Sequence, residues 1–157
     1  MAVVQIMLGG VKKQNKPLIS RITLNLMAEL LFKEEVYNIV GAAMEVHRAI
    51  GPGYLEPVYQ ETLAIELNLN NIPSVEQVRL SMEYKGHFLK HKYIPDFLCY
   101  DEIIVEIKAL KKCGPIEEAQ IINSIKAANK QVGLLINFCE PSLFWKKIHC
   151  LINHFLF

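Results

Sequence analysis

The sequence predicts one mixed α/β domain in which a central mixed sheet is flanked by helices. Two stretches with helical periodicity come first, three stretches with strand periodicity follow, and a helix, a strand and a terminal element complete the order. The length of 157 residues suits one compact domain with one substantial core. With 52% hydrophobic and 21% charged residues, the composition is that of a globular chain.

The N-terminal part differs from the rest of the chain. Its segment "GGVKKQNKP" has the composition of a turn or linker between two short apolar pieces. We therefore expect residues 1–28 to be a poorly ordered extension and residues 29–157 to form the single domain. The lysines follow the apolar stretch, the reverse of a secretory signal, and no apolar run reaches the ~18 residues of a membrane span. These features predict a cytoplasmic protein without membrane contact.

The overall charge attracts no particular partner. The formal net charge is +1 with histidine neutral, so no global field draws the chain to nucleic acid or membrane. The dense basic spots are "KALKK" at 108–112 and "WKK" at 145–147. Each is either solvated surface, which is the commoner case, or a local contact to phosphate.

Four cysteines are spread too widely for any C-x-x-C pair: Cys99, Cys113, Cys139 and Cys150. Neither a zinc site nor a disulfide framework is therefore indicated. We expect free and mostly buried thiols.

A first amphipathic helix is predicted from about Glu34 to the "GPG" turn at 51–53. Its apolar residues recur at three- and four-residue spacing. His47 lies on this apolar stripe, where a core histidine is commoner than a metal or catalytic ligand, and we expect a core role.

A second helix begins near "EPVYQETLAIELNLNN", because Pro57 suits the first helical turn and a core face follows it. Glu56 then takes the capping position, where the helix dipole favours a carboxylate. Ser, Thr, Asp and Asn are the preferred caps, so a glutamate is unexpected if capping is its only role.

Alternating apolar and polar residues in "PSVEQVRLSMEYKGHFLKHKYIPDFLCY" predict a β-hairpin that turns at "YKG" and whose second arm runs on into Asp96. The strand "EIIVEIKA" follows. One face of this strand is wholly apolar: Ile103, Val105, Ile107 and Ala109. The other face carries Glu106 and Lys108, so this is a central strand with charge toward one end.

The remaining elements follow in the same way. "GPIEEAQIINSIKAANK" is a helix with Gly114 and Pro115 at its start, and "QVGLLINF" is typical of a strand buried on both faces. The tail "PSLFWKKIHCLINHFLF" is one more strand or helix. Its apolar end "CLINHFLF" is either core or a surface for homodimer formation.

Asp96 and Glu106 are predicted to meet. If the turn between the hairpin and the central strand is centred on Asp101, Asp96 lies directly opposite Glu106, whereas a slip of one residue makes the two diagonal. Directly opposed carboxylates repel unless a proton or cation lies between them. Mg²⁺ is commonly held by one or two carboxylates together with waters and substrate phosphates. Lys108, on the same face, would orient or deprotonate an attacking water or neutralise charge on a phosphate, which fits phosphodiester hydrolysis.

The alternative for these charges is a structural ion pair. In that case Lys108 compensates Glu106 beside an exposed Asp96, and in an arbitrary protein this would be the commoner explanation.

A family resemblance changes the balance between these two explanations. "PD" at 95–96 followed by "EIK" at 106–108 looks like the PD-(D/E)XK motif of restriction-endonuclease-like nucleases. Gly53, Glu56 and Tyr59 form a G-x-x-E-x-x-Y arrangement, and "VHRAIGPG", "YKG", "VEIKA", "AQ" and "GLLINF" occur in order. Together these closely resemble the GxxExxY protein family, a branch of that nuclease superfamily, over about residues 32–150. The resemblance implies a restriction-endonuclease-like core in α-β-β-β-α-β order, which agrees with the predicted elements.

Carried over to this chain, the resemblance implies that Asp96 and Glu106 bind the metal, Mg²⁺ or Mn²⁺. It implies that Lys108 assists the attacking water and that Glu56 supplies an acidic group from an early helix. Gln120 falls where related nucleases have a Q-x-x-x-Y motif on the helix after the E-x-K strand.

Two positions depart from the family pattern. Ser124 stands where the motif that begins at Gln120 has tyrosine, so an aromatic ring that would pack against or position substrate is missing there. Cys139 stands where the family has glycine after "NF". Neither departure removes a proposed metal ligand.

The leading hypothesis is a Mg²⁺-dependent nuclease or related phosphodiesterase acting on DNA or RNA. The alternative is a nucleic-acid-binding or protein-interaction module that keeps the fold without turnover, which the near-zero net charge and the absent tyrosine favour. The complete Asp, Glu and Lys set favours the enzyme, because charges on an otherwise apolar strand are unfavourable without a role. A small-molecule enzyme has no support from a glycine-rich phosphate loop.

Overall fold

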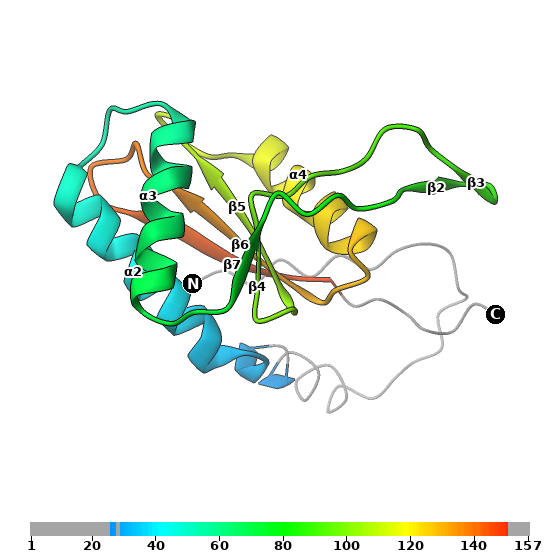
Figure 1. Cartoon of the computed structure of the whole chain (residues 1–157), viewed down its shortest axis with the longest axis horizontal. Coiled ribbons are helices and arrows are strands. Elements are labelled where there is room, and N and C mark those ends of the chain that lie inside the picture. The colour runs from blue at the N-terminus through cyan, green and yellow to red at the C-terminus, as the bar shows by residue number, and fades with distance from the viewer. Residues whose placement is uncertain (1–25, 28, 151–157) are drawn as a thin grey trace.

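The computed structural model of the chain describes residues 26–27 and 29–150 (Figure 1). Its elements in chain order are α2 (Lys33–Ile50), α3 (Glu56–Leu69), β1 (Ser74–Glu76), β2 (Glu83–Tyr84), β3 (His87–Phe88), β4 (Phe97–Cys99), β5 (Ile103–Lys108), α4 (Pro115–Ala127), β6 (Val132–Asn137) and β7 (Phe144–His149). Nearly all of the predicted N-terminal extension, and the apolar tail beyond Cys150, lie outside the described residues.

The five-stranded sheet has the order β1-β4-β5-β6-β7. Neighbouring strands are antiparallel except β5 and β6, which run parallel and are connected through α4. The helices α2 and α3 cover one face of the sheet and α4 covers the other (Figure 1). The predicted mixed α/β fold with a restriction-endonuclease-like arrangement is therefore confirmed, and the terminal element is a strand.

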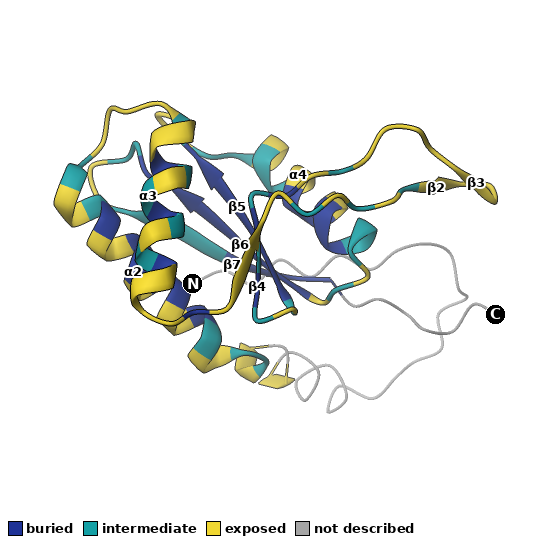
Figure 2. Ribbon diagram, in the orientation of Figure 1, coloured by how far each residue is buried: buried dark blue, intermediate teal, exposed yellow. Residues whose placement is uncertain are grey.

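The parallel strands β5 and β6 are buried along their whole length, as Figure 2 shows. Alternation along β5 sends Ile103, Val105 and Ile107 into the larger core under α2 and α3, and Ile104 into the smaller core under α4. On β6, Gly133 lets α4 approach closely, because a Cβ there would lie 2.6 Å from Cδ1 of Ile125.

The predicted hairpin is present but interrupted. Its base is the β1–β4 pair in the main sheet and its tip is the separate β2–β3 pair. Between them the regular ladder is broken, and the arms are joined by an isolated bridge, Leu80 to Tyr93, and by single hydrogen bonds such as that from the N–H of Leu89 to the oxygen of Met82. At the tip, Lys85 and Gly86 have φ of 49° and 79°, the two positive values of a tight hairpin turn. We call residues 79–93 the hairpin arm.

Helix α3 corrects one prediction. Glu56 was expected to cap this helix, but the cap residue is Leu55, with extended backbone at φ −76° and ψ 153°, and Glu56 is the first helical residue. Pro57 does lie in the first turn, as predicted. The side chain of Glu56 therefore does not cap α3, and its carboxylate can contact residues outside this helix.

The predictions for His47 and for the cysteines agree with the structure. His47 is half-buried, and its Nε2 lies 3.0 Å from the backbone oxygen of Glu140, as a satisfied core residue would. The cysteines are free thiols, of which Cys99 and Cys150 are buried. Among the described residues, none of the helices has the length and hydropathy needed to cross a bilayer.

Candidate active site

The opposition of Asp96 and Glu106 follows from the register of β4 and β5. In this antiparallel pair Phe97 lies opposite Val105, so the next residues outward are Asp96 and Glu106. The turn between the strands is centred on Asp101, which has a positive φ of 57°. This is the register predicted from the sequence.

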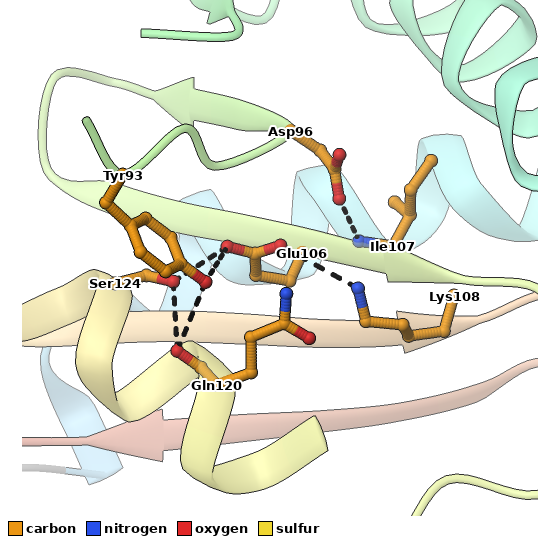
Figure 3. A network of polar contacts seen from close by, with 7 residues as sticks. All are labelled: Tyr93, Asp96, Glu106, Ile107, Lys108, Gln120 and Ser124. Carbon is orange, nitrogen blue, oxygen red and sulfur yellow. Dashed lines mark hydrogen bonds and ion pairs between the residues drawn. The ribbon is translucent and has the colours of Figure 1, made fainter. Parts of the chain in front are cut away.

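The side chain of Asp96 continues the strand pairing where the backbone ladder ends. Its Oδ2 accepts a 2.8 Å hydrogen bond from the backbone N–H of Ile107 (Figure 3). Burial raises the pKa of Asp96, while this hydrogen bond and the charge of Lys108 lower it. Asp96 is therefore fixed at the end of β4 and is not the exposed carboxylate of the structural ion-pair alternative.

Glu106 is buried on the α4 side of β5, with only 3% of its surface exposed. Its Oε1 accepts a 2.7 Å hydrogen bond from the hydroxyl of Ser124 and a 3.3 Å hydrogen bond from the hydroxyl of Tyr93. Burial raises the pKa of Glu106 to about 7; the bond from Ser124 lowers it and the charge of Asp96 raises it. This carboxyl group is therefore poised to change its protonation state near neutral pH.

Tyr93 and Ser124 were not predicted as site residues. The hydroxyl oxygens of Tyr93 and Ser124 also lie 3.4 Å and 3.1 Å from the backbone oxygen of Gln120. The hairpin arm thus delivers an aromatic ring beside Ser124, where the sequence lacks the tyrosine of the Q-x-x-x-Y pattern (Figure 3). The available sequence signal was the spacing of Gln120 and Ser124, which share one helix face.

Lys108 and Glu56 complete the charged group. The Nζ of Lys108 lies 3.9 Å from Oε2 of Glu106, and Lys108 is largely buried. Glu56 is half-buried, and its pKa is raised by burial, lowered by the charge of Lys108 and raised by the charge of Asp96. The start of α3 therefore brings a third carboxylate within electrostatic range of the strand residues.

Gln120 lies on α4 and is exposed. Figure 3 shows its side-chain amide pointing toward Glu106 and Lys108. Its backbone oxygen, rather than its amide, contacts the hydroxyl groups of Tyr93 and Ser124. The structure thus brings all five predicted site residues to one end of β5.

The loop before Glu56 is held by Tyr59, the last residue of the G-x-x-E-x-x-Y arrangement. The hydroxyl of Tyr59 donates to the backbone oxygen of Gly51 at 2.8 Å and accepts from the N–H of Tyr54 at 3.2 Å. Its ring stacks on Phe138 with centroids 4.7 Å apart. Gly53 supplies a φ of 112°, which other residues rarely adopt. The spacing therefore has a structural reason, since the glycine and the tyrosine set the position of the glutamate between them.

Asn137 supports the chain that follows Lys108. Its Oδ1 accepts from the N–H of Leu110 at 2.9 Å, and its Nδ2 donates to the oxygen of Leu110 at 2.8 Å. The N–H of Phe138 also donates to the oxygen of Lys108. The sequence places this asparagine inside the strand "QVGLLINF" and does not single it out, because nothing in the local pattern shows which backbone groups its amide contacts.

The carboxylates fit a divalent cation held partly by water and substrate. Among the described residues, the hydrogen bonds from Ile107, Ser124 and Tyr93 go to Asp96 Oδ2 and Glu106 Oε1. The second oxygen of each carboxyl group is the one that a ligand would use, and Nζ of Lys108 lies 3.9 Å from that of Glu106. Within residues 26–27 and 29–150, no cluster of three or more His, Cys, Asp or Glu side chains forms an all-protein metal site. Mg²⁺ suits such a partial site, because it commonly uses one or two carboxylates with waters and phosphates.

The two basic spots differ in the fold. Lys111 and Lys112 are exposed on the loop after β5. In "WKK", by contrast, Lys146 pairs with Glu118 at 2.6 Å, and Lys147 is buried and donates to backbone oxygens, one of them that of Glu29 at 3.0 Å. The two lysines of this second spot therefore have partners within the protein and are not solvated surface.

Comparison with known proteins agrees with this geometry. The sequence model of the PD-(D/E)XK nuclease superfamily matches residues 33–148. Among solved structures, the chain is similar to the crystal structure of a protein called SSO0001, with 17% sequence identity and a TM-score of 0.50 over 92% of this chain and 71% of that chain. At this identity the likeness concerns the fold alone. No curated protein matches the chain significantly.

Proposed function

Because the chain belongs to the PD-(D/E)XK nuclease superfamily, we propose that it is a Mg²⁺- or Mn²⁺-dependent nuclease that hydrolyses phosphodiester bonds of DNA or RNA. The observation that carries this proposal is the opposition of Asp96 and Glu106, a half-buried and a buried carboxyl group with raised pKa values. Within the superfamily, Gly53, Glu56 and Tyr59 support placement in the GxxExxY branch.

In this proposal Asp96 and Glu106 hold the divalent ion. The bound ion would supply a positive charge for the phosphate oxygens and lower the pKa of a water molecule. Lys108 orients the attacking water and offsets the charge that develops on the phosphate. Glu56 supplies a further acceptor for water or for a second cation, and Gln120 directs its amide toward substrate.

Tyr93 and Ser124 are positioning residues in the same proposal. Both donate to Oε1 of Glu106, which leaves Oε2 directed away from α4. Both hydrogen bonds lower the pKa of Glu106 and so favour its ionised, metal-binding form near neutral pH.

One observation favours the alternative, a nucleic-acid-binding module without turnover. Lys108 lies within ion-pair distance of Glu106, 3.9 Å from its Oε2, so one lysine already compensates part of the negative charge. In that case Asp96, Glu106 and Lys108 form a structural charge group at the end of β5, and nucleic-acid binding does not depend on a metal.

Calorimetric titration of Mg²⁺ and Mn²⁺, followed by cleavage assays on DNA and RNA, separates the two functions. At a pH above the pKa of Glu106, we expect both metals to bind the wild type and to support cleavage, and Glu106→Gln to lose both properties. Glu61→Gln makes the same change at an exposed position of α3 and should lose neither. If wild type binds neither metal at millimolar concentration and Glu106→Gln changes only stability, the charges are a structural ion pair.

A further inference from the structure

The hairpin arm concentrates positive charge that the chain as a whole lacks. Its basic side chains are all exposed: Arg79, Lys85, Lys90 and Lys92. Glu83 is its only acidic residue, so the arm has a formal net charge of +3, whereas the whole chain has +1 and the remainder is therefore −2. The basic run is divided between the two arms of the hairpin, which is why it is inconspicuous in the sequence.

The arm also exposes aromatic side chains that no core requires. Tyr84 is 61% exposed and Phe88 is 74% exposed. Tyr84 lies opposite His87 and Phe88 lies opposite Glu83, so the two rings occupy successive cross-strand pairs and point to opposite faces of the ribbon. In Figure 2 the residues of this tip are coloured as exposed. Such rings contribute little to folding and are available for a partner.

The arm is joined directly to the candidate active site. Leu80 and Tyr93 exchange backbone hydrogen bonds of 2.8 and 3.0 Å at its root. From that root the hydroxyl of Tyr93 reaches Oε1 of Glu106, and Asp96 follows along the chain. In Figure 1 the tip projects away from the sheet, beyond α4. A polyanion held along the arm would therefore run from its tip toward the carboxylates.

We propose that the hairpin arm binds double-stranded DNA, with its two-stranded ribbon in the major groove and its basic side chains on the flanking phosphates. This inference rests on the proposed nuclease function and names the substrate class of the same site. The major groove of B-form DNA, about 12 Å wide, admits a two-stranded ribbon, whereas the deep and narrow major groove of A-form RNA does not. Cations on both arms of the hairpin match phosphates on both sides of a groove, and an exposed phenylalanine can contact a thymine methyl group.

The test measures binding of a fluorescent DNA duplex by anisotropy over a salt series, with EDTA present so that no metal-dependent cleavage occurs. The full chain is used as wild type, as the arm variant Lys85→Gln/Lys90→Gln and as the control Lys33→Gln/Lys126→Gln. The control removes the same charge from the first residue of α2 and the last turn of α4. Circular dichroism checks that each variant is folded.

We expect the arm variant to bind duplex DNA at least tenfold more weakly than the control. Its salt dependence should fall by about 1.8 in the slope of log K against log salt, because each phosphate contact contributes about 0.9. Phe88→Ala should weaken binding without changing that slope. Duplex DNA should be preferred over duplex RNA and over single-stranded DNA.

Equal affinity of the arm variant and the control would overturn the proposal. A preference for single-stranded over duplex DNA would also overturn it, since the rings would then be stacking on bases rather than lying in a groove. Cleavage is measured separately with Mg²⁺. If the arm binds DNA but wild type cleaves nothing, the nuclease function is contradicted and the assignment of the arm to DNA stands. If wild type cleaves DNA but the arm variant binds as well as the control, the assignment of the arm is contradicted and the nuclease function stands.

Discussion

The hydroxyl of Ser124 lies 2.7 Å from Oε1 of Glu106, in a buried contact that joins α4 to β5. This hydrogen bond lowers the pKa of a carboxyl group whose burial raises it. It also occupies the oxygen that faces the helix. Ser124 thus links the protonation state of Glu106 to the position of α4.

Removing this hydroxyl should weaken metal binding in a pH-dependent way. In Ser124→Ala we expect the pKa of Glu106 to rise further above about 7, so that a higher pH is needed to ionise it. Mg²⁺ affinity should fall about tenfold at neutral pH, as is common for residues that support a metal ligand. Calorimetric titrations over a pH series would measure both effects. Asn123→Ala, at an exposed neighbour on α4, should behave as wild type, and an unchanged pH profile in Ser124→Ala would exclude this role.

The hydroxyl of Tyr93 should act in the same direction with a smaller effect. It lies 3.3 Å from Oε1 of Glu106, and of the groups that lower the pKa of Glu106 it has the smallest effect. In Tyr93→Phe we expect the pH profile of metal binding to move to higher pH by less than in Ser124→Ala, while the ring keeps its place. Because both hydroxyl groups serve one oxygen, the double variant should deviate from additivity. Additive effects would mean that the two hydroxyl groups act independently.

The strand residues of the site were predictable from the sequence because strand geometry is regular. Because side chains alternate along a strand, the sequence shows which residues of β5 face each core. A turn centred on Asp101 then pairs β4 with β5 so that Asp96 lies opposite Glu106. Both inferences need only local geometry.

Contacts made across irregular backbone were not predictable in the same way. Tyr93 reaches Glu106 because the hairpin loses its ladder between the tip and the main sheet, and alternation in the sequence does not reveal where pairing stops. The sequence places Lys147 in a short basic run, yet the backbone oxygens of Glu29 and Leu31, just before α2, accept hydrogen bonds from its buried amine. Glu56 was expected at the cap position because its spacing from Pro57 does not distinguish the cap from the first helical residue.

The contact between α4 and β6 gives a prediction about stability. A Cβ at Gly133 would lie 2.6 Å from Cδ1 of Ile125 and 2.9 Å from Cγ1 of Ile121, so Gly133→Ala would force the helix or its side chains outward. We expect a loss of about 1–3 kcal/mol in the free energy of unfolding, as for other overpacked cores. Denaturant unfolding would measure it.

Gly41→Ala provides the matched control, because nothing lies within 4 Å of a Cβ at this position in α2. There alanine should stabilise the chain by about 0.5–1 kcal/mol through its higher helix propensity. If both alanine variants were equally stable, α4 would not be packed as tightly on Gly133 as the structure shows.

The buried charge of Glu106 predicts an unusual dependence of stability on pH. Its pKa is about 7 in the folded protein, against an ordinary value of 4.5, so between these values the folded state binds more protons than the unfolded state. Stability should therefore fall as pH rises through this window in the absence of metal. Glu106→Gln stays neutral and keeps an oxygen for Ser124, so at about pH 8 we expect it to be more stable than wild type by about 3 kcal/mol, since one pKa unit corresponds to about 1.4 kcal/mol.

This difference should vanish near pH 4, where Glu106 is protonated in both states. The buried His149, whose pKa is lowered to about 4, also changes stability with pH, but it is present in both proteins and cancels in the comparison. Saturating Mg²⁺ should reverse the order at pH 8, because it stabilises only the protein that binds it. Thermal unfolding with and without Mg²⁺ would test all three expectations. A less stable Glu106→Gln at pH 8 without metal would mean that the ion pair with Lys108 outweighs the burial of the carboxylate, and the structural explanation of these charges would then be preferred.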